Sequence, residues 1–219
     1  RDFSIGFFLN EFLLVLIGVS LAFLLNLFQG NRSHKKVMIE NMRYTEQQLQ
    51  EILERVAVYL REKNTEGSIW ADIGRLEEKL KIFIEQAYEY QNNTWHYYID
   101  YFEMRRKQYS ILHNLHYEIK KIRNMPDQAE VVADYICYLK KHVTEMNDPK
   151  EQIEDLHKIL EDMEQARLPK SWEEFEGKAK VYHIMMDLEE FLICKKRFVE
   201  SLDEKKLRIY WNKEKKLSH

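Results

Sequence analysis

The sequence predicts an all-α protein in which one transmembrane helix precedes a cytoplasmic bundle of about five to six helices. The first observation behind this fold class is an N-terminal run of 14 residues, FLLVLIGVSLAFLL, that contains no charged side chain. The second is composition, since only 6 glycines and 3 prolines occur in 219 residues and 32% of the residues are charged. The third is periodicity, because apolar residues recur three and four positions apart and no stretch alternates long enough to predict a strand.

The apolar run lies inside a longer segment, residues 3–28, that predicts the transmembrane helix. A helix of residues 12–28 alone measures about 25 Å at ~1.5 Å per residue, whereas one that starts at Ile5 measures roughly 36 Å. Only the longer helix crosses a hydrocarbon core of ~30 Å with some tilt. We therefore expect the span to begin upstream of Asn10, and we assign residues 1–30 to it.

Two other interpretations of this segment are less favoured. A signal peptide would have a basic region before the apolar run, a small-residue cleavage site after it and an initiator Met, and none of these occurs. A buried core helix is seldom apolar on every face. The small residues Gly18, Ser20 and Ala22 would let another membrane helix pack closely, so we expect the lipid bilayer and upstream transmembrane helices as partners.

Basic residues after the apolar segment predict its orientation. Only Arg1 precedes the segment, and the cluster that follows comprises Arg32, His34, Lys35, Lys36 and Arg43. Because segments rich in Lys and Arg stay on the cytoplasmic side, we expect a protein of the cell membrane whose residues 31–219 form one cytoplasmic domain. The 2 cysteines fit that compartment, since they offer neither a disulfide framework nor a CxxC pair.

Six helices are expected after the span. The first covers about residues 33–63 and ends at the turn residues NTEGS, residues 64–68. The second covers about residues 69–87 and either stops at the polar QNNT stretch or continues through it. The third is strongly aromatic from Thr94 onward and should end before Pro126, because the residue before a proline is pushed out of the helical conformation.

The last three helices have recognisable starts. Asp127 is placed to cap the fourth helix, and Asp148 followed by Pro149 matches the start of the fifth. The sixth covers about residues 171–215, and it begins with a Ser and, three positions later, Glu174, which is the pattern of a capping box. Each helix has one apolar stripe, so a bundle is the simplest arrangement that buries all of them.

The sequence offers little catalytic equipment, so we expect neither an enzyme nor a cofactor. It contains no Gly-rich phosphate loop, no HExxH or GxSxG motif and no zinc-spaced cysteine set. His113 and His116 can share a helix face, but Glu118 is poorly placed as a third ligand, and no metal site is predicted. The net charge of −3 does not favour a nucleic-acid partner.

One band on the third expected helix mixes aromatic rings with polar groups on a side that should face the core. Its members, which recur three and four positions apart, are Tyr98, Tyr101, Phe102, Arg105, Gln108, Tyr109 and Leu112. A buried arginine needs an anionic partner. Either Glu174 or Glu176 makes a structural ion pair with it, or its guanidinium holds a small carboxylate ligand whose ring stacks on Tyr or Phe.

Three segments together resemble the C-terminal domain of bacterial aromatic acid exporters. They are the apolar helix FLLVLIGVSLAFLLNLF, the aromatic segment YYIDYFEMRRKQYSIL and the segment LPKSWEEFEGKAKVYHIMMDLEEFLICKKRF. The resemblance extends over nearly the whole chain, and it implies several membrane helices followed by a cytoplasmic helical domain. Positions that carry the family pattern include Arg105, Gln108, Glu174, Glu176 and Tyr182.

The resemblance implies a cytoplasmic regulatory or ligand-sensing domain of an exporter of aromatic carboxylic acids. Two alternatives stay open: a structural oligomerisation tail of the same exporter, and a single-pass membrane-anchored helical scaffold. Further partners implied are a small aromatic carboxylate and other copies of the chain. The residues expected to bind the ligand are Tyr98, Tyr101, Arg105, Gln108, Glu174, Glu176 and Tyr182.

Overall fold

The computed structural model describes residues 5–62, 69–89, 96–122 and 125–211, without the side chains of residues 5–8, 26–33 and 69–73. Within these ranges the chain forms helices and no strand, which confirms the all-α prediction. The helices are α1 (Ile5–Glu62), α2 (Ile69–Glu89), α3 (His96–Lys120), α4 (Gln128–Lys140), α5 (Lys150–Gln165), α6 (Trp172–Glu200) and α7 (Glu204–Trp211). The predicted NTEGS turn and the QNNT stretch lie outside the described residues.

The chain divides into two compact units, residues 1–41 and residues 42–219. The first unit contains the N-terminal part of α1, whose large apolar side chains between Leu9 and Leu25 are exposed. Over the side chains that are described, no helix combines the length and the apolarity needed to cross a bilayer. The span expected at residues 1–30 extends beyond the described side chains at both ends, so it stays a prediction without support from the structure.

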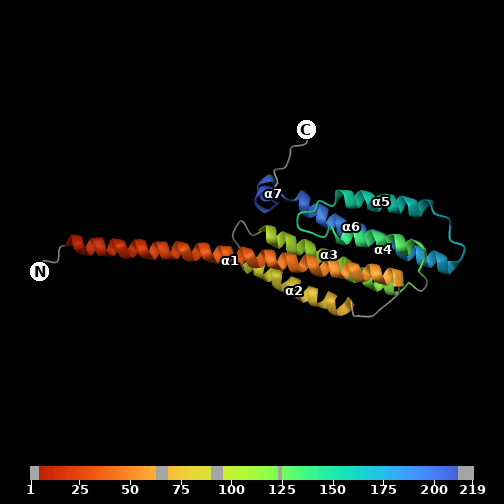
Figure 1. The fold of residues 1–219 in the computed structure, drawn as a ribbon, viewed down its shortest axis with the longest axis horizontal. Coiled ribbons are helices and arrows are strands. Elements are labelled where there is room, and N and C mark those ends of the chain that lie inside the picture. The colour runs from red at the N-terminus through yellow and green to blue at the C-terminus, as the bar shows by residue number, and fades with distance from the viewer. Residues whose placement is uncertain (1–4, 63–68, 90–95, 123–124, 212–219) are drawn as a thin grey trace, which may run out of the picture. The chain divides into compact units, whose positions relative to one another are not determined.

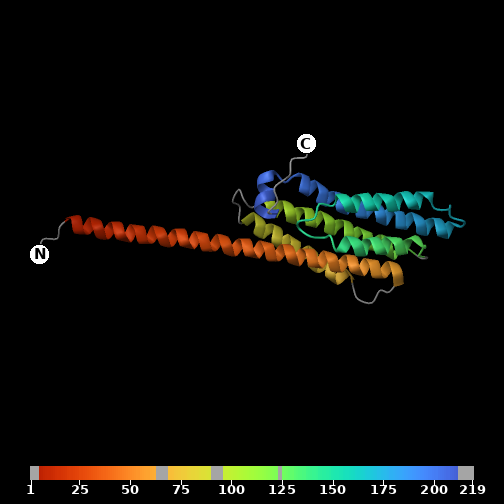
Figure 2. The same cartoon turned by 45° about the horizontal axis from the view of Figure 1, so that its top comes forward.

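The second unit is a helical bundle with α3 at its centre, as Figure 1 shows. α3 packs against α2 and α6, and α6 also contacts α4 and α5. Figure 2 shows α5 and α6 side by side along their length. α3 and α6 run antiparallel. Gln108 in α3 donates to the backbone carbonyl of Phe191 in α6, whereas the backbone carbonyl of Lys121, just after α3, accepts from Lys180, which comes earlier in α6. This register decides which residues of the two helices meet.

Aromatic rings fill the space around the first half of α3. Tyr97 and Tyr101 lie 5.6 and 5.9 Å from the ring of Phe198 on α6, measured between ring centroids. On the other side of α3, Phe102 lies 5.6 Å from Phe83 on α2. Tilted and edge-to-face pairs of this kind add about 0.5–1.5 kcal/mol each to the stabilisation from burial alone. The aromatic segment of the sequence is therefore core.

The expected helix starts agree with the structure to different degrees. Ser171 is the N-cap of α6 and accepts a hydrogen bond from the backbone N–H of Glu174 at 3.2 Å, which confirms that start. The Glu174 carboxylate bonds the backbone N–H of Lys170, one residue earlier than a capping box requires. Asp127 occupies the N-cap position of α4 without a side-chain cap, and Pro149 is the N-cap of α5 rather than its first residue.

The prediction of one long sixth helix is wrong, because α6 ends well before Lys215 and α7 follows it. Asp203 accepts a hydrogen bond from the backbone N–H of Lys206 at 2.7 Å and so caps the first turn of α7. The capped turn interrupts a stretch whose apolar periodicity continues. At the far end of α7, Trp211 donates to the hydroxyl of Tyr97 on α3 at 3.0 Å.

Candidate functional site

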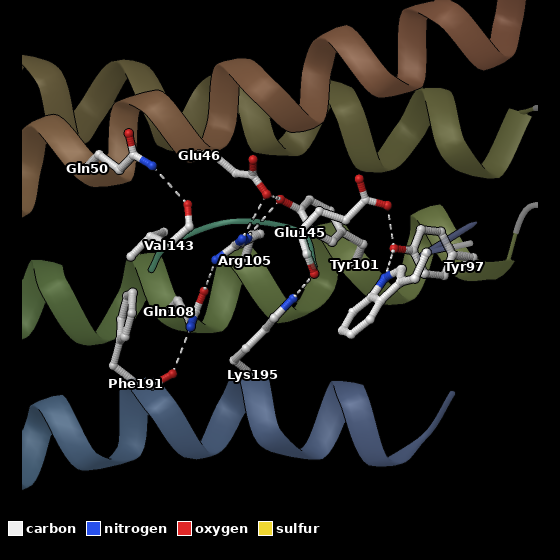
Figure 3. A network of polar contacts seen from close by, with 11 residues as sticks. Glu46, Gln50, Tyr97, Tyr101, Arg105, Gln108, Val143, Glu145, Phe191 and Lys195 are labelled. Carbon is white, nitrogen blue, oxygen red and sulfur yellow. Dashed lines mark hydrogen bonds and ion pairs between the residues drawn. The ribbon is translucent and has the colours of Figure 1, made fainter. Parts of the chain in front are cut away.

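Arg105 lies in the middle of α3 with only 1% of its surface exposed. Its Nε donates to the Tyr101 hydroxyl at 3.0 Å, and its Nη1 donates to Gln108 Oε1 at 2.8 Å (Figure 3). The two partners stand four positions before Arg105 and three positions after it, so the helical repeat alone aligns the three side chains. All three are buried, as their spacing predicts.

The charge of Arg105 is balanced by Glu46, a residue of α1 that belongs to the bundle unit. Arg105 Nη2 lies 3.1 Å from Glu46 Oε1, and the Tyr101 hydroxyl donates to the same oxygen at 2.8 Å. The Glu46 side chain is 15% exposed. Burial opposes the charged form of Arg105, but Tyr101 and Glu46 outweigh burial and hold the pKa of the guanidinium above its ordinary value.

The expected ion pair between Arg105 and Glu174 or Glu176 is wrong. Gln108, next to Arg105, reaches α6 at Phe191, which is at least 15 residues beyond either glutamate, or more than ~20 Å along the helix. Glu174 pairs instead with a neighbouring arginine at 3.0 Å, and Glu176 pairs with a lysine four positions along α6 at 2.7 Å. Both glutamates therefore make ion pairs at the surface near the start of α6.

Gln108 carries the network from α3 to α6. Its Oε1 accepts from Arg105, and its Nε2 donates to the backbone carbonyl of Phe191 at 2.8 Å. Because a guanidinium only donates, the amide oxygen must face Arg105 and the amide nitrogen must face α6. One continuous set of polar contacts, Glu46 to Arg105 to Gln108 to Phe191, therefore joins three helices. We call these four residues the Arg105 chain.

A second buried cation, Lys195 on α6, lies beside the Arg105 chain in Figure 3 and is 4% exposed. Its Nζ donates to the backbone carbonyl of Glu145, in the connection between α4 and α5. The ammonium also lies 5.1 Å from the ring centroid of Phe198 and 5.2 Å from that of Trp211. Burial, reinforced by the positive charge of Arg105, holds the pKa of Lys195 well below its ordinary value.

The carboxylate of Glu145 belongs to the same region. Tyr97 donates its hydroxyl proton to Glu145 Oε1 at 2.6 Å, and the same hydroxyl accepts from the indole N–H of Trp211 at 3.0 Å. Burial raises the pKa of the Glu145 carboxyl. With the Arg105 chain and Lys195, two acidic and two basic side chains from four segments of the sequence share one mostly buried region.

Glu46, Glu145 and Lys195 are not among the site residues predicted from the sequence. Lys195 has a detectable signal, because it stands on the apolar stripe of α6 between Phe191 and Phe198, at helical spacing. The two glutamates have none, since each lies in a polar stretch where charged residues are expected to be solvated.

The remaining predicted site residues lie apart from the Arg105 chain. Tyr98 is buried, and its ring contacts that of Tyr97 edge to face at 5.4 Å, while burial raises the pKa of its hydroxyl. Tyr182 is 39% exposed and, like Glu174 and Glu176, lies in the first half of α6. Of the predicted ligand-binding residues, Tyr101 and Arg105 contact Glu46, and Gln108 contacts Arg105. The other four lie apart from this group.

This arrangement is suited to holding helices together. Within the described part of the chain, no group of three or more His, Cys, Asp or Glu residues is placed to hold a metal ion. A carboxylate arriving from solution would have to displace Glu46 before it could bind Arg105. Arg105 and Glu46 therefore form a structural ion pair, in which the Glu46 carboxylate occupies the position where a ligand carboxylate was expected.

Comparison with known proteins identifies relatives of this chain. The family model described as "Putative aromatic acid exporter C-terminal domain" matches residues 35–196. A curated relative, "Uncharacterized protein YqjA" of Bacillus subtilis (strain 168), is 27% identical over 198 residues, which cover 88% of this chain and 60% of the relative. The chain therefore spans less than two thirds of that relative's length.

A solved structure shares the fold. It is titled "Crystal structure of putative membrane protein from Clostridium difficile 630", and it superposes with a TM-score of 0.67 at 20% sequence identity. The similarity covers 75% of this chain and 98% of the solved one. At this level of identity the comparison supports the helical arrangement alone.

Proposed function

The chain belongs to the "Putative aromatic acid exporter C-terminal domain" family, and from this premise we propose that it is the cytoplasmic regulatory domain of a bacterial membrane exporter. Family membership indicates a transport-associated protein and association with a membrane. The proposal adds that residues 31–219 are cytoplasmic and that residues 1–30 include the transmembrane helix closest to that domain. It also adds that the domain responds to aromatic carboxylic acids and thereby controls export.

One observation carries the proposal: the buried pair of Glu46 and Arg105 fixes α1 to α3. The helix that contains Glu46 also contains the exposed large apolar side chains between Leu9 and Leu25. Exposed apolar stretches of this size mark contact with a membrane or another protein. Breaking or strengthening the pair would change how firmly α1 is held, and α1 is the part of the domain that is continuous with the apolar segment.

A second candidate function is a structural tail that stabilises the exporter without responding to a ligand. The observation that favours it is the burial of Arg105 among three internal acceptors, Tyr101, Gln108 and Glu46. An arginine in this state already has the carboxylate that a ligand would provide. The two functions agree on the fold and differ on whether the Glu46 pair changes during transport.

Export by cells that make the full-length protein separates these functions. The variant Glu46→Gln keeps an oxygen for Tyr101 and Arg105 but removes the negative charge. For a regulatory domain, we expect 4-hydroxybenzoate efflux with an altered dependence on internal 4-hydroxybenzoate, at unchanged protein level. Unchanged efflux in Glu46→Gln, with efflux lost only when residues 42–219 are deleted, would support the structural tail. Unchanged efflux in both would exclude a role in transport.

A further inference from the structure

The first half of α6 has an exposed apolar stripe in addition to the stripe that packs in the core. Its members follow one another at intervals of three and four residues, and they are Trp172, Phe175, Ala179, Tyr182 and Met186. Trp172 is 75% exposed, and the other three large side chains are 39% to 48% exposed. Among the side chains described in the bundle unit, no other helix exposes more than two large apolar residues. Apolar residues at this spacing on an exposed face are typical of a helix that contacts another protein.

A hollow of about 210 Å³ lies beside this stripe, among the start of α4, the end of α5 and α6 itself. The residues that α6 contributes to its lining are Phe175, Lys178, Ala179 and Tyr182. For scale, an engineered apolar cavity of ~150 Å³ binds benzene. The hollow therefore admits a ring system somewhat larger than benzene, such as the indole of tryptophan, which is a benzene ring with a second ring fused to it.

Trp172 is the most exposed member of the stripe and stands next to the hollow. Its ring centroid lies 5.3 Å from that of Phe175, which is part of the lining. A projecting indole and a hollow of matching size thus occupy one face of the molecule. In a twofold dimer the same patch of each copy meets the other, so the ring of each copy can enter the hollow of the other. This self-complementarity favours a second copy of the chain as the partner.

The charges on this face are complementary in the same way. Lys170 stands two positions before Trp172, whereas Glu164 lines the hollow. Both side chains are exposed, and neither makes a hydrogen bond or ion pair with a residue that the structure describes. Lys178, the basic residue of the lining, is already engaged, because its Nζ donates to a backbone carbonyl at 2.8 Å and lies 3.4 Å from a glutamate oxygen. The hollow therefore presents a negative charge, and a positive charge accompanies the projecting ring.

The exposed area is on the scale of a small specific interface. At ~150–250 Å² for a whole aromatic side chain, the exposed parts of Trp172, Phe175 and Tyr182 amount to roughly 300 Å² per copy. The smallest specific interfaces bury about 600 Å² per partner. Leu168, which is 85% exposed, and Met186 add apolar area before and after the three rings, and the charged residues form a polar rim.

We propose that two copies of this chain associate through this face about a twofold axis. Trp172 of each copy enters the hollow of the other, and Lys170 of each copy pairs with Glu164 of the other. The inference goes beyond the proposed function, because it requires no ligand and assigns the contact between copies to residues outside the Arg105 chain.

Sedimentation equilibrium of the full 219-residue chain tests the proposal, with detergent micelles in excess so that two chains do not share one micelle by chance. We expect a monomer–dimer equilibrium. Trp172→Ala should weaken dimerisation about tenfold or more, because a buried tryptophan is a frequent hot spot. Ala179→Leu should also weaken it, because the larger side chain fills the hollow.

Tyr88→Ala is the matched control, since Tyr88 on α2 is an aromatic residue that is 47% exposed and lies outside the stripe. It should leave dimerisation unchanged, and circular dichroism checks that all three variants fold. A monomeric wild type would overturn the proposal and leave the stripe to a different protein. A dimer that either stripe variant leaves intact would overturn it too, because another surface, such as the apolar segment of α1, would then hold the copies together.

Charge reversal tests whether the partner is a second copy in the proposed arrangement. Glu164→Lys would bring two lysines together across the interface, and Lys170→Glu would bring two glutamates together, so each variant alone should dimerise several-fold more weakly. In an equimolar mixture both contacts again join opposite charges, and dimerisation should return. Mixing cannot correct a folding defect, so recovery would identify a direct contact. Variants that dimerise like the wild type, or a mixture that dimerises no better than its components, would refute the arrangement.

Discussion

Glu46 and Arg105 form a buried ion pair at 3.1 Å although 59 positions separate them in the sequence. The pair has an unequal environment, because Arg105 is almost fully buried whereas the Glu46 side chain keeps 15% of its surface exposed. Removing the arginine would leave a carboxylate that water can partly reach. Removing the glutamate would leave a guanidinium that water cannot reach. Substitutions at the two positions therefore have different consequences.

Replacing Arg105 with Met tests how much the pair stabilises the bundle. Loss of one partner from a buried pair costs about 3–5 kcal/mol, and the partial exposure of Glu46 places the expected cost near the lower end of that range. The measurement is the free energy of unfolding from urea titration. Arg106→Met is the matched control, because Arg106 is the adjacent arginine, its side chain is 54% exposed and its partner Glu103 lies three positions earlier. The control should change stability by less than about 0.5 kcal/mol. A loss below ~1 kcal/mol for Arg105→Met would mean that the pair is not a main source of stability.

Lys195 gives the bundle a pH dependence whose sign follows from burial. Its pKa lies well below 10.5 in the folded protein and returns toward 10.5 on unfolding. Between these two values the unfolded chain binds more protons than the folded one, so the free energy of unfolding should rise as the pH rises through that window. Below the folded pKa this dependence disappears.

The variant Lys195→Met isolates this contribution. Urea titrations of wild type and variant from pH 7 to 10 share every other titrating group, so the difference between the two curves reports on position 195. We expect the wild type to gain stability relative to Lys195→Met as the pH rises. Parallel curves over the whole range would show that Lys195 has the same pKa in both states and is not buried as described.

The helical class and several helix starts follow from the sequence because they depend on local chemistry. Apolar spacing defines each stripe, and Ser171 caps α6 through a backbone group only three residues away. The buried position of Arg105 is equally local, because its neighbours on α3 are set by the helical repeat. These features need no knowledge of distant segments.

The partners of Arg105 do not follow from the sequence, because they depend on how the helices pack. Glu46 sits in the polar stretch TEQQ, where nothing distinguishes it from solvated glutamates. Glu174 is one of the partners that the sequence predicts for Arg105, but the antiparallel register of α3 and α6 places it several helical turns away from Arg105. The break before α7 can be predicted only in part. Asp203 is a recognisable cap, but it stands inside a stretch that otherwise continues the helical pattern.

Capping by Asp203 should control the order of α7. Its Oδ1 accepts from the N–H of Lys206, and its carbonyl accepts from the N–H of Leu207 at 3.0 Å. Asp203→Ala removes the side-chain cap and should cost about 1 kcal/mol, whereas Asp203→Asn keeps an acceptor oxygen and should cost little. Hydrogen exchange of the α7 amides measures the effect. Exchange as slow in Asp203→Ala as in the wild type would show that the carboxylate does not cap this helix.

The membrane span expected at residues 1–30 has a direct test in the full chain. Leu16 and Leu21 lie near the centre of the apolar segment, where each arginine costs about 2.5–3.5 kcal/mol on insertion scales. The double variant Leu16→Arg/Leu21→Arg should therefore leave the membrane fraction of cells that make this 219-residue chain. The matched control, Leu16→Ile/Leu21→Ile, keeps the segment apolar and should remain in that fraction with the wild type. If the arginine variant also remains, or if the wild type never fractionates with membranes, residues 1–30 do not form the transmembrane helix. In that case the exposed apolar side chains between Leu9 and Leu25 must be covered by another protein surface.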